Sequence, residues 1–192
     1  MNFKDLERIN TFATKNASNA LSKITGSPSA INYFKVAIGS IKMFQPFMDD
    51  KEIKVATVVP FTQALEGTSV LVLKLEDALI LSRLFLRKKP STNKKLSEME
   101  ICALNEIGNI VAGSYTTILS NMLGKKILTH PPIFTSGVFD TLISEFKKLM
   151  KPASKNVVVI DISFSIEQPK LRGKFFVILK LADIEEDLKI TA

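Results

Sequence analysis

The sequence predicts an α+β fold in which one antiparallel sheet with pseudo-twofold symmetry packs against long helices, all within an internally duplicated chain. Three observations lead to this prediction. Segments in the first half resemble segments in the second, each half opens with a long amphipathic pattern that ends at a glycine, and each half contains two strand-like runs. The 192 residues, 46% of them hydrophobic and 23% charged, are enough for one large globular domain.

The duplication is visible as two matches in the same order, each with an offset of roughly 100 residues. The matching pairs are "NASNALSKITG" (Asn16 to Gly26) with "SYTTILSNMLG" (Ser114 to Gly124), and "SVLVLKLEDALIL" (69–81) with "FFVILKLADIEEDL" (175–188). We therefore expect a single domain over residues 1–192, divided into a first repeat at 1–85, a basic linker at 86–95 and a second repeat at 96–192.

Each repeat is expected to contain the same elements in the same order. A long helix ends at a glycine, which suits the position just after a helix, and a second amphipathic helix follows, with room for a short strand between them. Two long strands then form a hairpin, because β-branched and aromatic residues alternate there between Gly and Pro breaks. The second helices are expected at 35–48 and 138–151, and the strands at 52–64, 67–77, 156–168 and 173–183.

The composition excludes several classes of protein. The start "MNFKDLERIN" has no basic stretch followed by an apolar run, so no signal peptide is expected, and the apolar run near Val70 is broken by charges before it could span a membrane. One cysteine excludes an internal disulfide, and one histidine argues against a metal site. These features favour a cytoplasmic protein. The net charge of +7 makes nucleic-acid binding a candidate function, but the sequence contains no nucleic-acid-binding motif.

The helix expected from Ser97 onward carries the most informative pattern. Ser97 and Glu100 have the spacing of a capping box. At about 100° per residue, one side of this helix forms an apolar stripe in which Gly108 allows close packing. The stripe consists of Ile101, Leu104, Val111, Tyr115, Ile118 and Met122.

Glu106 and Asn109 lie on the opposite, outward side of this helix, about 60° apart. Cys102 and Gly113 share that side, and Gly113 leaves space beside the pair. On spacing alone, a Glu and an Asn three residues apart are an ordinary feature of an exposed helix face.

The residues around the pair make it more specific. The stretch "LSEMEICALNEIGNIVAGSYTTILSNMLGKKILTHPP" (96–132) resembles the second half of the CheC family of chemotaxis phosphatases, to which the CheX and FliY domains are related. That family carries Glu-x-x-Asn on a long exposed helix, with an Asp or Ser four residues before the Glu and a Pro about 23 residues after the Asn. Glu106, Asn109 and Pro132 match this pattern, and the expected duplicated architecture is also that of the family.

The resemblance implies a role in two-component signal transduction. CheC-like proteins hydrolyse the aspartyl phosphate of a CheY-type receiver. By this resemblance, Asn109 would orient the attacking water and Glu106 would pair with the active-site lysine of the receiver. The receiver would supply the Mg²⁺, so the chain needs no cofactor of its own.

Two departures from the family pattern bear on activity. Cys102 stands where the family has Asp or Ser, and a thiol is a weaker hydrogen-bonding group; without a histidine placed to activate it, Cys102 is not expected to act as a nucleophile. In the first repeat, Lys4, Arg8 and Thr11 occupy the positions of Cys102, Glu106 and Asn109. The first site is therefore interpreted as degenerate, and its basic face either touches an acidic partner or is simply solvated.

Glu7 and Asn10 do form Glu-x-x-Asn in the first repeat, but one residue out of register. Asn10 corresponds to Gly108 and should point toward the core. His130, although the only histidine, is interpreted as a structural or surface residue.

The helix expected at 138–151 has apolar residues at helical spacing, which favours core packing. In CheC proteins the corresponding helix contributes to binding the deamidase CheD. Phe139, Asp140 and Ile143 are the residues expected to take part if such a partner binds here.

Two readings of function follow from the sequence. The first is a phosphatase of a CheY-type receiver with one working site, in the second repeat. The second is a non-catalytic CheC-like adaptor that binds the receiver, CheD or components of a flagellar or archaellar switch. Intact Glu106, Asn109 and Pro132 favour the enzyme, whereas Cys102 and the degenerate first site favour the adaptor.

Overall fold

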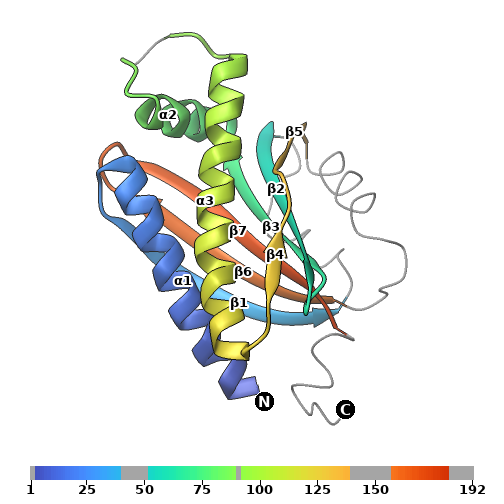
Figure 1. The fold of residues 1–192 in the computed structure, drawn as a ribbon. Helices are drawn as coiled ribbons and strands as arrows, with labels where there is room; N and C mark the ends of the chain where they lie inside the picture. Colours follow the sequence, from blue (N-terminus) through green and yellow to red (C-terminus); the bar gives the residue numbers. More distant parts are fainter. Residues whose placement is uncertain (1–2, 40–51, 90–91, 139–156, 182–192) are drawn as a thin grey trace.

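The structure is a computed structural model that describes residues 3–39, 52–89, 92–138 and 157–181. Within these ranges two long helices and a shorter one pack against an antiparallel sheet (Figure 1). The helices are α1 (Phe3–Thr25), α2 (Leu75–Phe85) and α3 (Glu98–Leu123). The strands are β1 (Ser29–Gly39), β2 (Lys54–Gln63), β3 (Gly67–Lys74), β4 (Ile127–Thr129), β5 (Ile133–Gly137), β6 (Val157–Ile166) and β7 (Leu171–Lys180).

The strand order carries the pseudo-twofold symmetry that the sequence predicts. The order is β1-β6-β7-β3-β2, and both β4 and β5 pair with β2 at the far edge. Exchanging the two halves of the chain maps this order onto itself, with β3 and β7 paired at the centre. The predicted fold class is thereby confirmed. The division into a first repeat at 1–85, a linker at 86–95 and a second repeat at 96–192 stays a prediction.

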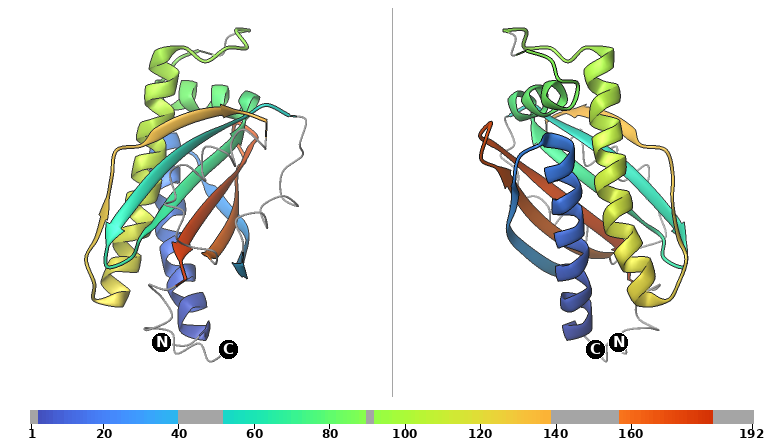
Figure 2. Two further views of the ribbon diagram at one scale, coloured as in Figure 1. Left: turned by 90° about the vertical axis from the view of Figure 1, so that its right-hand side faces the viewer. Right: turned by 60° about the vertical axis from the view of Figure 1, so that its left-hand side comes forward.

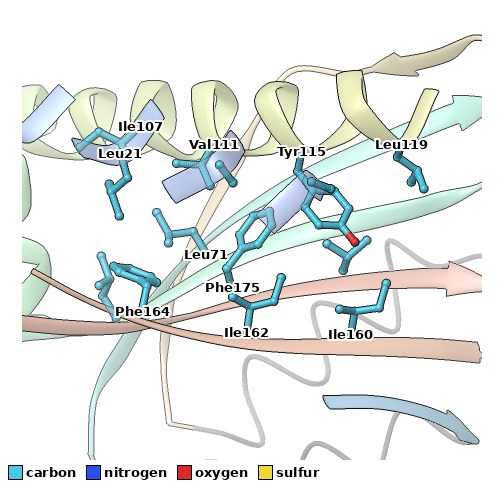
Figure 3. Close-up of a cluster of buried hydrophobic side chains, with 14 of the residues drawn as sticks. Leu21, Leu71, Ile107, Val111, Tyr115, Leu119, Ile160, Ile162, Phe164 and Phe175 are labelled. Carbon is cyan, nitrogen blue, oxygen red and sulfur yellow. The ribbon is translucent and has the colours of Figure 1, made fainter. Parts of the chain in front are cut away.

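The core lies between the sheet and the long helices. Side chains alternate along β2, β3, β6 and β7, so every second residue points to the helices and the others point to the opposite face. Figure 3 shows residues of α3, among them Ile107 and Val111, directed at Ile162 and Phe175 of the sheet. Tyr115 also packs edge-on against Phe175, with ring centroids 5.7 Å apart.

The two long helices run antiparallel and side by side on one face of the sheet (Figures 1 and 2). They meet near the pseudo-twofold axis, where the Asn16 side-chain amide donates to the Ser114 carbonyl at 2.8 Å. Asn16 and Ser114 are equivalent positions in the two repeats. Tyr115 donates from its hydroxyl to the side-chain oxygen of Asn10, and both residues are fully buried. This hydrogen bond holds the helices together inside the core.

Both ends of α3 form as the sequence predicts. Ser97 accepts from the Glu100 backbone N–H, and the Glu100 side chain accepts from the Ser97 backbone N–H, which completes the capping box. At the other end Gly124 takes the left-handed conformation, with φ of 64°.

The buried face of α3 is broader than the predicted stripe. Leu104, Val111 and Tyr115 are buried as expected, but Ile101 and Ile118 are half-buried and Met122 is 40% exposed. The remaining buried positions are small or polar as well as apolar: Glu100, Ala103, Ile107, Gly108, Ala112, Thr116 and Leu119. Met122 lies in the last turn of α3.

Two sequence predictions about secondary structure are wrong. Residues 35–39 belong to strand β1, not to a helix, because Lys35 to Gly39 pair with Asp161 to Val157 of β6. The strand predicted at 67–77 ends at Lys74, and α2 follows at once. The remainder of the helix predicted at 35–48, and the helix predicted at 138–151 beyond Val138, lie outside the described residues.

An ion pair ties the start of α3 to α2. Arg83 Nε lies 2.7 Å from Glu100 Oε1, and the two side chains are only 11% and 6% exposed. Arg83 also donates to the Asn93 carbonyl at 2.8 Å, so it holds the connection between the two helices. Burial raises the pKa of Glu100, but hydrogen bonds from Ser97 and Arg83 and the Arg83 charge outweigh it and leave that pKa lowered.

Replacing Arg83 should therefore destabilise the fold strongly. Arg83→Ala leaves the Glu100 carboxylate buried without its cation, which we expect to lower the free energy of unfolding by about 3 to 5 kcal/mol. Urea unfolding followed by circular dichroism measures this change. The matched control is Glu52→Gln, which breaks the exposed Lys74–Glu52 pair and should cost at most about 1 kcal/mol. Similar losses for the two variants would contradict a special role for the buried pair.

Candidate functional site

The predicted pair lies on the outward face of α3. Glu106 is exposed, Asn109 is half-buried, and Cys102 is exposed as a free thiol. At 100° per residue, all three fall within an arc of about 60° on the side of the helix opposite Ile107 and Val111. The carboxylate and the carboxamide are thus displayed to the outside on one surface.

The two glycines of α3 have different surroundings. A Cβ added to Gly108 would lie 2.4 Å from Thr57 Cγ2 of β2, so the absence of a side chain lets α3 approach the sheet. Thr57 also donates to the Leu104 carbonyl at 3.3 Å. A Cβ added to Gly113 would meet nothing within 4 Å. Gly108 is therefore required by packing, whereas Gly113 leaves open space next to Asn109, one turn away.

The loop between β4 and β5 carries Pro132 and His130 at the edge of the sheet. Pro132 is half-buried, and β5 follows it directly along β2. The His130 backbone N–H donates to the Pro60 carbonyl at 2.8 Å, and its ring nitrogen Nε2 lies 2.7 Å from the Thr62 hydroxyl. These contacts attach the loop to β2, and they agree with a structural role for His130.

The first repeat presents different chemistry at the equivalent positions. Arg8 and Thr11 are exposed on α1, and the Thr11 hydroxyl donates to the Glu7 carbonyl of its own helix at 2.9 Å. Asn10 is fully buried, which confirms that it points to the core. The side chain of Lys4, and all of Phe139, Asp140 and Ile143, lie outside the described residues.

The candidate residues lie on the outward face of a single helix. A cavity of about 360 Å³ does occur near the α2 end of the sheet, but its lining comes from the strands and the start of α2, with no residue of α3. In that cavity burial raises the pKa of Asp77, and this effect outweighs the hydrogen bond from the Arg172 backbone and the nearby positive charges. One face of a single helix does not by itself enclose a small substrate, which favours a ligand that brings its own concave site.

One residue of this face was missed from the sequence. Met99 is 57% exposed, and it lies only about 20° around the helix from Glu106 and seven residues before it. The helical wheel contains this signal, but an isolated Met near a helix start does not stand out as an exposed apolar contact.

The described residues support neither a metal site nor a membrane-spanning helix. The described residues include no group of three or more His, Cys, Asp or Glu side chains that could hold a metal ion. Among the helices described, none is long and apolar enough to cross a membrane.

Sequence comparison finds similarity to CheC-like proteins in this segment. A profile of the CheC-like family matches residues 99–136, which include Glu106, Asn109 and Pro132. The CheY-P phosphatase CheC of Bacillus subtilis is 29% identical over 82 residues, or 42% of this chain and 39% of that protein. The aligned part is therefore less than half of this relative.

Solved structures share the fold over most of the chain. FliY of Thermotoga maritima is similar over 97% of this chain and 94% of its own, with a TM-score of 0.75 and 24% identity. CheX in the CheX–CheY complex from Borrelia burgdorferi covers 86% of this chain and 94% of its own, with a TM-score of 0.56 and 21% identity. The FliM middle domain from H. pylori covers 97% of both chains, with a TM-score of 0.65 and 14% identity. The resemblance to CheC-like proteins and their fold is thus confirmed.

The two glycines of α3 give a prediction with an internal control. Gly113→Ala should raise the free energy of unfolding by about 0.5 to 1 kcal/mol, because alanine favours the helix and no atom obstructs its methyl group. Gly108→Ala should lower it by about 1 to 3 kcal/mol, because the methyl group overlaps Thr57. Thermal unfolding of both variants tests whether the free energy of unfolding rises in Gly113→Ala and falls in Gly108→Ala. A destabilising Gly113→Ala would mean that the space beside Asn109 is not open.

Proposed function

We propose that this protein is a phosphatase that hydrolyses the aspartyl phosphate of a CheY-type receiver in chemotaxis signalling. The observation that carries the proposal is the outward display of Glu106 and Asn109 on a helix fixed at both ends and at Gly108. The CheC and CheX relatives support it, since one is a CheY-P phosphatase and the other forms a complex with CheY, BeF₃ and Mg²⁺.

The proposed reaction needs little covalent chemistry from the phosphatase. An aspartyl phosphate is an acyl phosphate, and the receiver supplies the Mg²⁺ and a lysine that neutralise its oxygens. Water attacks the phosphorus in line, the bond from phosphorus to the aspartyl oxygen breaks, and inorganic phosphate and a free carboxylate result. A carboxamide both accepts from and donates to water, so Asn109 can hold the nucleophile in position.

Glu106 has the complementary task of docking. Its carboxylate is exposed on the same surface as Asn109, where a lysine of the receiver can reach it. Such a pair would fix the register of the helix in the receiver's active site. The open space at Gly113 would then admit the receiver backbone close to Asn109.

Cys102 bears on the rate of the proposed reaction. It lies one turn before Glu106 at the position of the family's Asp or Ser, and its thiol offers only weak hydrogen bonds to the receiver. The activity is therefore expected to be lower than with an oxygen ligand at this position, but not abolished.

A non-catalytic adaptor is the alternative function. The FliM middle domain shares this fold, so the scaffold also occurs in flagellar proteins. The first repeat has Arg8 and Thr11 in place of the Glu and Asn pair. In the second repeat, Cys102 stands where the family pattern has Asp or Ser. As an adaptor the protein would bind the receiver, CheD or a switch component without accelerating hydrolysis.

The decay of the phosphorylated receiver separates the two functions. We expect the wild-type protein to accelerate the loss of ³²P from the receiver of the same organism, and Asn109→Ala to reduce that acceleration on the order of 100-fold. Glu106→Ala should weaken receiver binding as well. Asn121→Ala, an exposed asparagine in the last turns of the same helix, is the matched control and should leave the rate unchanged.

Two results would contradict the phosphatase assignment. One is a folded wild-type protein that binds the phosphorylated receiver and leaves its decay unchanged, which is the behaviour of an adaptor. The other is acceleration that survives in both Asn109→Ala and Glu106→Ala.

A further inference from the structure

The outer face of α1 carries a stripe of exposed residues that the proposed function does not use. Arg8, Phe12, Lys15, Asn19 and Lys23 follow one another at helical spacing within an arc of about 80°. Phe12 is 50% exposed, so half of an aromatic side chain meets solvent between two cations. We call these five residues the α1 stripe.

The cations of the α1 stripe have no partners within the described part of the chain. The ion pairs found there use other cations, and neither Arg8 nor Lys15 makes a side-chain hydrogen bond. Lys23 lies in the last turn of α1, where the helix dipole favours a cation. That explanation does not apply to Arg8 and Lys15, and neither packing nor pairing accounts for the exposed Phe12.

The pseudo-twofold symmetry shows how the α1 stripe differs from the candidate site. Arg8 is equivalent to Glu106, and Lys15 is equivalent to Gly113. Where α3 offers a carboxylate beside open space, α1 offers two long cations around an aromatic ring. The equivalent surface therefore has the opposite charge, and it fits a partner of opposite polarity.

The Arg8 end of the α1 stripe is far enough from Glu106 to act separately, whereas Lys23 lies at nearly the same height along the helices as Glu106. Asn16 and Ser114 meet near the axis, and Arg8 and Glu106 each precede them by eight residues on antiparallel helices. At 1.5 Å per residue, Arg8 and Glu106 are about 24 Å apart along the helix axes. A receiver docked at Glu106 would leave the Arg8 end of α1 accessible.

We propose that the α1 stripe is a docking surface for an acidic segment of a second protein partner, distinct from the receiver, in which an apolar residue covers Phe12. Carboxylates of the segment pair with Arg8 and Lys15, and burial of the ring excludes water around those pairs. The protein would then hold two partners at once, one on each of its two related helices.

The test uses a labelled 18-residue peptide in which Glu and Leu alternate at helical spacing, with fluorescence anisotropy as the measurement. Full-length wild-type protein should bind it, and Arg8→Gln/Lys15→Gln should weaken binding about tenfold or more. Adding Phe12→Ser to this double variant should weaken peptide binding further. An otherwise identical peptide with Gln in place of Glu should not bind. The matched control is Lys88→Gln/Lys89→Gln, which removes two exposed lysines elsewhere and should change the affinity less than twofold.

Three outcomes would overturn the proposal. Equal weakening by the Lys88 and Lys89 control would show that only net charge matters. Binding of a DNA duplex through the same residues, as tight as that of the peptide, would assign the stripe to nucleic acid. Slower receiver dephosphorylation by Arg8→Gln/Lys15→Gln would make the stripe part of the receiver's own docking surface.

Discussion

The contact between Gly108 of α3 and Thr57 of β2 fixes the direction in which α3 presents its polar face. With no side chain at Gly108, the helix lies close to the sheet, and Thr57 bonds to the Leu104 carbonyl from below. The capping box at Ser97 and the pair between Arg83 and Glu100 fix the start of the same helix. In the proposed function Asn109 holds one water molecule in position, and this task requires a rigid support of this kind.

The duplicated scaffold explains why two related helices carry different chemistry. The buried residues of α1 and α3 are constrained by the shared sheet and by the Tyr115–Asn10 hydrogen bond between them. Outward residues such as Arg8 and Glu106 are exposed, so that constraint does not apply to them. The second repeat has a carboxylate and a carboxamide there, and the first has cations around Phe12. One architecture can in this way offer two surfaces to two classes of partner.

Much of the fold was predictable because its signals are local. The capping box, the glycine after α3 and the alternation in β2, β3, β6 and β7 each involve residues close in sequence. Strand β1 was not predictable in this way, since its partner β6 lies more than one hundred residues away and pairing with it overrides the helical pattern from Lys35. Helix α2 was missed because it begins at Leu75, directly after the end of β3, with no Gly or Pro between them.

The candidate site was predictable in position more than in extent. The helical wheel placed Glu106, Asn109, Cys102 and Gly113 on the outward face and predicted space at Gly113, but it did not show that Met99 extends the same surface. The ion pair between Arg83 and Glu100 joins residues on two helices, and no pattern within either helix predicts it.

Under the proposed function, the Glu106 face of α3 docks into the active site of a receiver. A double-mutant cycle probes this docking, with Glu106→Ala in this protein, the active-site lysine→Ala in the receiver, and the affinity for the beryllofluoride-activated receiver as the measurement. We expect a coupling free energy of about 1.5 kcal/mol or more between the two side chains. Additive effects, with coupling below about 0.5 kcal/mol, would contradict it.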